Sequence, residues 1–91
     1  MTTVTRNGKE YPVVEIAGVE FEAYGEYQFF RDAGTRWFWI DLTKDGMWTA
    51  EEAQTNAWDD AGSGPLQWEK CDTKEDAAQQ IKEWMSNGAN T

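Results

Sequence analysis

Residues able to perform acid–base or nucleophilic chemistry are few in this sequence, although carboxylates are abundant. There is no histidine, which excludes Ser–His–Asp triads, Cys–His pairs and imidazole bases. Cys71 is the only cysteine, and the acids that follow it, such as Asp72 and Glu75, should raise the pKa of its thiol. Among 17 Asp and Glu, spacing alone does not mark a glycosidase-like pair. The sequence predicts a protein that is not an enzyme and uses no cofactor.

The segment from Asp41 to Glu52 has oxygen-bearing side chains at the intervals that a calcium loop needs. Acids stand at its first, fifth and twelfth positions, Gly46 at the sixth and Thr49 at the ninth. In this pattern it resembles an EF-hand calcium loop. The resemblance implies side-chain ligands and one main-chain carbonyl ligand from Asp41, Thr43, Asp45, Glu52 and Met47. The same residues also fit an Asp-Gly turn before a capped acidic helix. Calcium binding is therefore kept as an alternative hypothesis for the function.

Acidic residues are grouped along the chain rather than mixed with bases. The 91 residues carry a formal net charge of −9. Five Glu and no Lys or Arg lie between Glu10 and Phe30, and six acids and no base lie between Asp45 and Glu69. This charge repels nucleic acid and anionic membranes and attracts basic surfaces. We therefore predict a basic protein partner, with no direct nucleic-acid or membrane binding; an acidic surface that serves solubility alone is the other interpretation.

Alternation of apolar and polar residues around Ala17-Gly18 predicts a β-hairpin. With these two residues as the turn, Ile16 faces Val19 and Glu15 faces Glu20. The apolar residues then share one face and the glutamates share the other. One face of this hairpin should therefore be buried and the other solvated.

A second hairpin is predicted from two aromatic segments, residues 27–31 and 36–42, which flank a turn that contains glycine. Alternation in the second segment places apolar side chains on both faces. Phe38, Ile40 and Leu42 fall on one face, and Trp37 and Trp39 on the other. Either another element covers the tryptophan face, or that face binds a partner.

Two helices and one short strand are predicted in the second half of the chain. A helix over residues 73–86 carries an apolar stripe and ends at Asn87-Gly88. A weaker middle helix over residues 50–61 follows the capping-box pattern Thr49-x-x-Glu52. Residues 66–71 are predicted to form a short strand.

Together these elements predict an α+β fold: an antiparallel sheet of three to four strands, a C-terminal helix on one face and the weaker middle helix. Residues 1–10 are expected to be a flexible segment, and residues 11–88 a single domain. The N-terminal residues lack the apolar core of a signal peptide, and no apolar run is long enough to span a bilayer. The expected location is the cytoplasm.

The sequence favours a non-enzymatic module that binds, and blocks, a basic nucleic-acid-binding surface of a partner protein. In size, acidity and lack of chemistry it is similar to small inhibitors from phages and other mobile elements, such as anti-CRISPR and DNA-mimic proteins. The predicted partner-binding residues are Glu15, Glu20, Glu22, Phe30, Trp37, Trp39, Asp59 and Asp60. A third hypothesis is a structural protein that dimerises through its aromatic sheet face, so the chain is expected to be a monomer or a homodimer.

Overall fold

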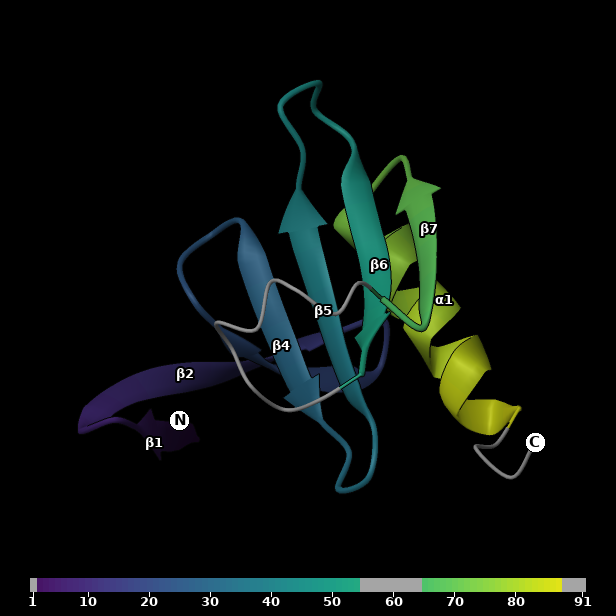
Figure 1. The fold of residues 1–91 in the computed structure, drawn as a ribbon. Helices are drawn as coiled ribbons and strands as arrows, with labels where there is room; N and C mark the ends of the chain where they lie inside the picture. The colour runs from purple at the N-terminus through teal and green to yellow at the C-terminus, as the bar shows by residue number, and fades with distance from the viewer. Residues whose placement is uncertain (1, 55–64, 88–91) are drawn as a thin grey trace.

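The computed structural model describes residues 2–54 and 65–87. In these ranges it contains a seven-stranded antiparallel sheet, whose strands lie side by side in chain order, and one α-helix (Figure 1). The elements are β1 (Thr3–Arg6), β2 (Lys9–Ile16), β3 (Val19–Ala23), β4 (Gln28–Asp32), β5 (Trp37–Leu42), β6 (Trp48–Ala53), β7 (Gln67–Cys71) and α1 (Lys74–Ser86). The predicted count of three to four strands is therefore wrong.

An N-terminal hairpin occupies much of the segment that was expected to be flexible. β1 pairs with the first half of β2, with Arg6 opposite Lys9. Asn7 and Gly8 form the turn with φ values of 54° and 82°. Two successive positive φ angles are what a two-residue hairpin turn requires, and Asn-Gly is the pair that adopts them most readily. The Asn-Gly pair was thus a sequence signal for this hairpin.

Both predicted hairpins are confirmed, the first of them with its predicted register. Ile16 lies opposite Val19 and Glu15 opposite Glu20 across the Ala17-Gly18 turn. β4 and β5 pair from Gln28–Asp41 to Asp32–Trp37. The register of the first hairpin follows from local alternation and a two-residue turn, which is why the sequence was sufficient to predict it.

The predicted middle helix is wrong, because its first residues form β6. This strand pairs with β5 on one side and β7 on the other, with Ala50 between Ile40 and Glu69. Ala50 is fully buried beneath α1, where a small side chain lets the helix approach the sheet. Cross-strand hydrogen bonds on both sides outweigh the helix propensity of the segment. Residues 55–61 of the predicted helix lie outside the described part of the chain.

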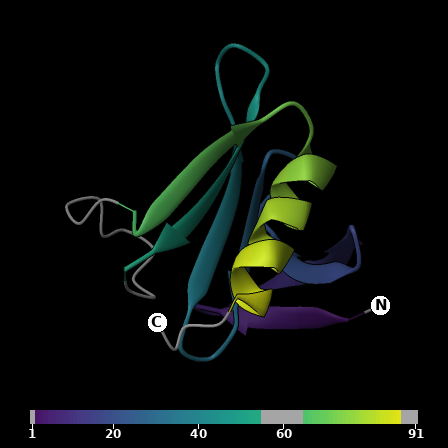
Figure 2. The same ribbon diagram turned by 90° about the vertical axis from the view of Figure 1, so that its right-hand side faces the viewer.

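The predicted C-terminal helix is confirmed as α1, which packs on one face of the sheet (Figure 2). Its N-cap is Thr73, whose hydroxyl accepts a hydrogen bond from the Asp76 amide at 3.0 Å. Ala77, Ala78 and Ile81 are fully buried against the sheet. The other members of this core come from the strands: Ile16, Val19, Phe21, Ala23, Phe29, Phe38, Ile40 and Ala50.

The sheet is strongly curved, and its N-terminal hairpin reaches the face opposite α1. β2 crosses the direction of β4–β6 at a steep angle (Figure 1). This brings Arg6 of β1 over Phe30 of β4, with 5.7 Å from the guanidinium carbon to the ring centroid. The hairpin thus covers one end of the face that α1 leaves uncovered. In the described ranges, no helix combines the length and the apolar character that crossing a membrane would need.

Candidate functional site

The sheet face opposite α1 carries a row of acidic and aromatic side chains. Trp39 of β5, Glu51 of β6 and Trp68 of β7 lie directly opposite one another across the three strands. Trp39 and Glu51 are half-buried, whereas Trp68 is 50% exposed. We call Trp39, Glu51, Trp68 and the neighbouring Asp41 the acidic–aromatic row.

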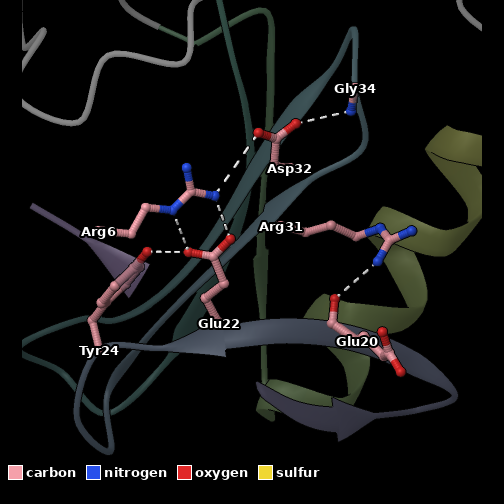
Figure 3. Close-up of polar contacts among 7 residues, drawn as sticks. All are labelled: Arg6, Glu20, Glu22, Tyr24, Arg31, Asp32 and Gly34. Carbon is pink, nitrogen blue, oxygen red and sulfur yellow. Dashed lines mark hydrogen bonds and ion pairs between the residues drawn. The ribbon is translucent and has the colours of Figure 1, made fainter. Parts of the chain in front are cut away.

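Beside the row, an ion pair closes the end of the face under the N-terminal hairpin (Figure 3). Arg6 donates to both carboxylate oxygens of Glu22, at 3.0 Å from Nε and 2.5 Å from Nη2. The Tyr24 hydroxyl donates to the same carboxylate, and burial together with this negative charge raises the pKa of Tyr24. Phe30 is only 1% exposed and packs against Trp39, with 4.5 Å between the ring centroids and 45° between the ring planes. This end of the face is a packed aromatic core with a satisfied carboxylate.

Arg31 connects the diverging ends of β3 and β4. Nη1 of Arg31 donates to the Glu20 carbonyl at 3.0 Å (Figure 3), and its Nε contacts the Met85 sulfur at 3.3 Å. A cavity of about 130 Å³ lies between the two strands at this point. Among the charged groups around it, Glu22 and Asp32 pair with Arg6, and Arg31 is bound to the Glu20 carbonyl.

Two carboxylates of the row differ from the other shielded carboxylates of the molecule. In the described ranges, four Asp and Glu residues are not classed as exposed: Glu22, Asp41, Glu51 and Glu52. Glu22 and Glu52 each pair with an arginine. None of the ion pairs between described residues includes Asp41 or Glu51. Within the described part of the chain, the row therefore holds two partly desolvated carboxylates without an ion-pair partner.

The electrostatics of these two groups follow from that arrangement. Burial raises the pKa of Glu51, and the negative charge of Asp41 raises it further. Burial also raises the pKa of Asp41, although a hydrogen bond from Gln28 opposes this shift. Both groups would be ionised more readily if a cation stood beside them.

The predicted partner-binding residues fall in different places. Trp37 and Trp39 are half-buried on the face of the row, and the indole Nε1 of Trp37 is buried without a hydrogen-bond acceptor among the described residues. Glu22 and Phe30 are buried and thus not available to a partner. The two remaining glutamates, Glu15 and Glu20, are exposed on the β2–β3 hairpin, away from the row. Asp59 and Asp60 lie outside the described residues.

Sequence reasoning missed Glu51 and Trp68. Glu51 could not be placed beside Trp39 while residues 50–61 were expected to be helical. Trp68 lay in a predicted strand whose neighbour was unknown. Alternation of apolar Trp48 and Ala50 with polar Thr49 and Glu51 was the available signal for β6, and Glu52 interrupts it.

The five residues of the calcium hypothesis do not converge. Asp45 pairs with Lys70 at 2.7 Å and accepts from Thr43 in the β5–β6 turn. Glu52 lies in β6 opposite Phe38, and it binds Arg36. Alternation puts Glu52 on the opposite sheet face from Asp41, which faces Thr49. Met47 accepts from the Thr43 amide within the turn at 2.8 Å. In the described ranges, no three His, Cys, Asp or Glu side chains form a cluster suited to a metal ion.

We expect millimolar calcium to shift the melting temperature no more than the same concentration of magnesium does. The reason is that Glu52 and Asp45 are already bound to cationic side chains on different parts of the hairpin. Differential scanning fluorimetry with each salt measures this directly. A stabilisation specific to calcium, and lost in Glu52→Gln, would contradict the prediction.

Cys71 ends β7 and is half-buried. Burial raises the pKa of its thiol, and the charges of Glu69, Asp76 and Asp72 raise it further. The thiol form is therefore favoured at neutral pH, as the acidic neighbours in the sequence predicted. This environment suits packing better than nucleophilic attack.

Comparison of this chain with protein-family models, with curated proteins and with solved structures finds no match. A function for the chain is therefore inferred from the geometry of its described residues.

Proposed function

We propose that this protein is a non-enzymatic binding module that docks the acidic–aromatic row on a basic surface of a partner protein. The observation that carries the proposal is the pair of half-buried carboxylates, Glu51 and Asp41, which take part in no ion pair within the described ranges and lie near an exposed tryptophan. Lys70 lies on the same face opposite Thr49, but its ammonium pairs with Asp45. A partner that supplies positive charge would offset their desolvation, and Trp68 would bury its indole in the same contact.

The distribution of the remaining charges supports a basic partner. Each arginine in the sequence is engaged within the chain: Arg6 with Glu22, Arg36 with Glu52, and Arg31 with a main-chain carbonyl. The formal net charge is −9, and none of the three arginines is left without a partner in the chain. By covering a basic surface that binds nucleic acid, such a module would act as an inhibitor of the anti-CRISPR or DNA-mimic type in the cytoplasm.

Replacing Trp68 with alanine should speed dissociation from the partner without unfolding the domain. Trp68 is 50% exposed on an edge strand, so its ring contributes little to the core but much to a contact that covers it. The partner is first recovered from a lysate of the source organism and purified, and its association and dissociation rates are measured by surface plasmon resonance.

Association should also slow as salt rises, because the Debye length falls from about 10 Å at 0.1 M to about 3 Å at 1 M.

Tyr27→Ala is the matched control, since Tyr27 is an exposed aromatic residue (59%) outside the row. It should leave the dissociation rate unchanged. A partner that binds equally well at low and high salt, or a Trp68→Ala variant that dissociates like the parent, would overturn the proposal. Sedimentation of the free protein tests the rival hypothesis: a dimer dispersed by Trp68→Ala would assign the face to self-association.

A further inference from the structure

We propose that the acidic–aromatic row receives one arginine side chain of the partner, whose guanidinium pairs with Glu51 and Asp41 and stacks on Trp68. This inference rests on the proposed function, because it names the chemical group that the basic partner would present.

The register of the sheet places these groups within reach of a single guanidinium. Residues directly opposite in antiparallel strands have Cβ atoms about 4.5–5.5 Å apart, so Glu51 lies between the side chains of Trp39 and Trp68. Asp41 is the diagonal neighbour of Glu51, since it faces Thr49 two residues away, and such neighbours are about 7–8 Å apart. Two carboxylates and an exposed indole thus lie on one face. Lys70 lies opposite Thr49 on this face, and its ammonium pairs with Asp45 at 2.7 Å instead.

The chain itself shows twice how such a carboxylate is satisfied. Glu22 receives two hydrogen bonds from Arg6, and that guanidinium lies over the Phe30 ring at 5.7 Å. Glu52 receives two from Arg36, at 2.8 and 3.0 Å, and that guanidinium lies over the Phe38 ring at 5.2 Å.

At both places a shielded carboxylate, an arginine and an aromatic ring occur together. Glu51 has the shielded carboxylate and the aromatic rings, but in the described ranges no arginine joins them. The acidic–aromatic row is therefore a third arrangement of this kind, and the missing member is an arginine.

Guanidinium fits this arrangement better than the ammonium group of lysine. It is planar, so it can lie flat on an indole while its fork of N–H groups points to a carboxylate. It is also more weakly hydrated, which lowers the cost of bringing it to a partly desolvated site. Tryptophan is the aromatic residue with the strongest cation–π attraction.

The probe that tests this is Nα-acetyl-arginine methylamide, added to the ¹⁵N-labelled protein while the six indole N–H signals are followed by NMR. We expect a saturable shift of the Trp68 signal. The lysine analogue should bind several-fold more weakly, and the citrulline analogue, which has nearly the same shape without the charge, should give no saturable shift. Sodium chloride at matched ionic strength corrects for screening.

Two variants locate the interaction. Glu51→Gln should abolish the saturable shift, whereas Glu26→Gln, which removes one charge from an exposed turn, should retain it. The fold of Glu51→Gln is checked by its melting temperature, which should not fall, because the substitution removes a partly desolvated charge. Trp68→Ala, at an exposed position, should reduce arginine binding as judged from the Trp39 signal and provides a second test.

Equal binding of the arginine and lysine probes, or unchanged arginine binding by Glu51→Gln, would overturn the inference. Salt-dependent binding to a basic partner could still be observed in that case, and the proposed function would stand. The opposite result is also possible. The protein could bind arginine saturably while its recovered partner binds independently of salt and of Trp68. In that case the arginine site would stand and the proposed function would be overturned.

Discussion

Arg36→Ala should lower the free energy of unfolding by about 3–5 kcal/mol, the usual effect of removing one partner from a buried ion pair. The side chains of Arg36 and Glu52 are only 14% and 6% exposed. Without the guanidinium, Glu52 would keep its charge in a site from which water is largely excluded. Gln67 donates one hydrogen bond to Glu52 at 2.8 Å, which cannot replace a positive charge.

Arg36 also supports the C-terminus of α1. Its Nη1 donates to the Trp84 carbonyl at 3.0 Å, one of the last carbonyls of the helix. The last turn of α1 contains no basic residue, so Arg36, from the β4–β5 connection, supplies the cation that favours this helix end. The substitution therefore weakens a sheet contact and a helix terminus together.

Urea unfolding followed by tryptophan fluorescence measures the loss. Lys70→Ala is the matched control, because the Lys70–Asp45 pair is exposed on both sides and should have little effect on the midpoint. The double variant Arg36→Ala with Glu52→Gln should be more stable than Arg36→Ala, since it leaves no unpaired charge. Arg36→Ala with an unfolding midpoint equal to that of the parent would show that the ion pair does not stabilise the fold.

The difference between the parent and Arg36→Ala should shrink in acid. The hydrogen bonds and charge of Arg36 hold the pKa of Glu52 below its usual value. A carboxylate with a lowered folded pKa stabilises the protein above its unfolded pKa, about 4.3, and loses this contribution as pH falls through the folded value. Glu51 and Asp41 have raised pKa values in the folded protein, so they affect stability in the opposite direction. Their ionisation lowers the free energy of unfolding as pH rises through their folded pKa values.

The parts of the fold that sequence reasoning predicted are those set by neighbours in the chain. The Ala17-Gly18 hairpin and the stripe of α1 each depend on residues a few positions apart. β6 depends instead on partners in β5 and β7, and its Thr49-x-x-Glu52 pattern is locally that of a helix start. The residues of this segment alone do not determine whether it forms a capped helix or a strand that gains hydrogen bonds on both sides.

The candidate site was predicted only in part, because some of its features depend on strands that are distant in the sequence. The aromatic face with Trp37 and Trp39 follows from alternation within one strand. The carboxylates that become buried could not be told from the exposed ones, because the residues next to Glu22 and Glu51 in the sequence do not show which side chains of other strands will cover them. Only the curvature that brings Arg6 to Glu22, and leaves Glu51 without such a partner in the described ranges, separates a structural acid from a candidate binding acid.

Ile81→Ala should lower the free energy of unfolding by about 2–5 kcal/mol, the range for removing a large aliphatic side chain from a core. Ile81 is fully buried, and it packs with Ala77 and Ala78 against the sheet. Its buried neighbours one turn earlier in α1 are alanines, which are too small to fill the space.

The same denaturant titration provides the measurement, and two further variants set the scale. Gln79→Ala, on the exposed side of α1, should leave the midpoint unchanged or raise it slightly, because alanine favours helix. Ile81→Val removes one methylene and should cost about 0.5–1.5 kcal/mol. Since small domains have a total stability of about 5–15 kcal/mol, Ile81→Ala should remove a large share of it. If Ile81→Ala unfolded at the same urea concentration as Gln79→Ala, the packing of α1 on the sheet would not be the core of this protein.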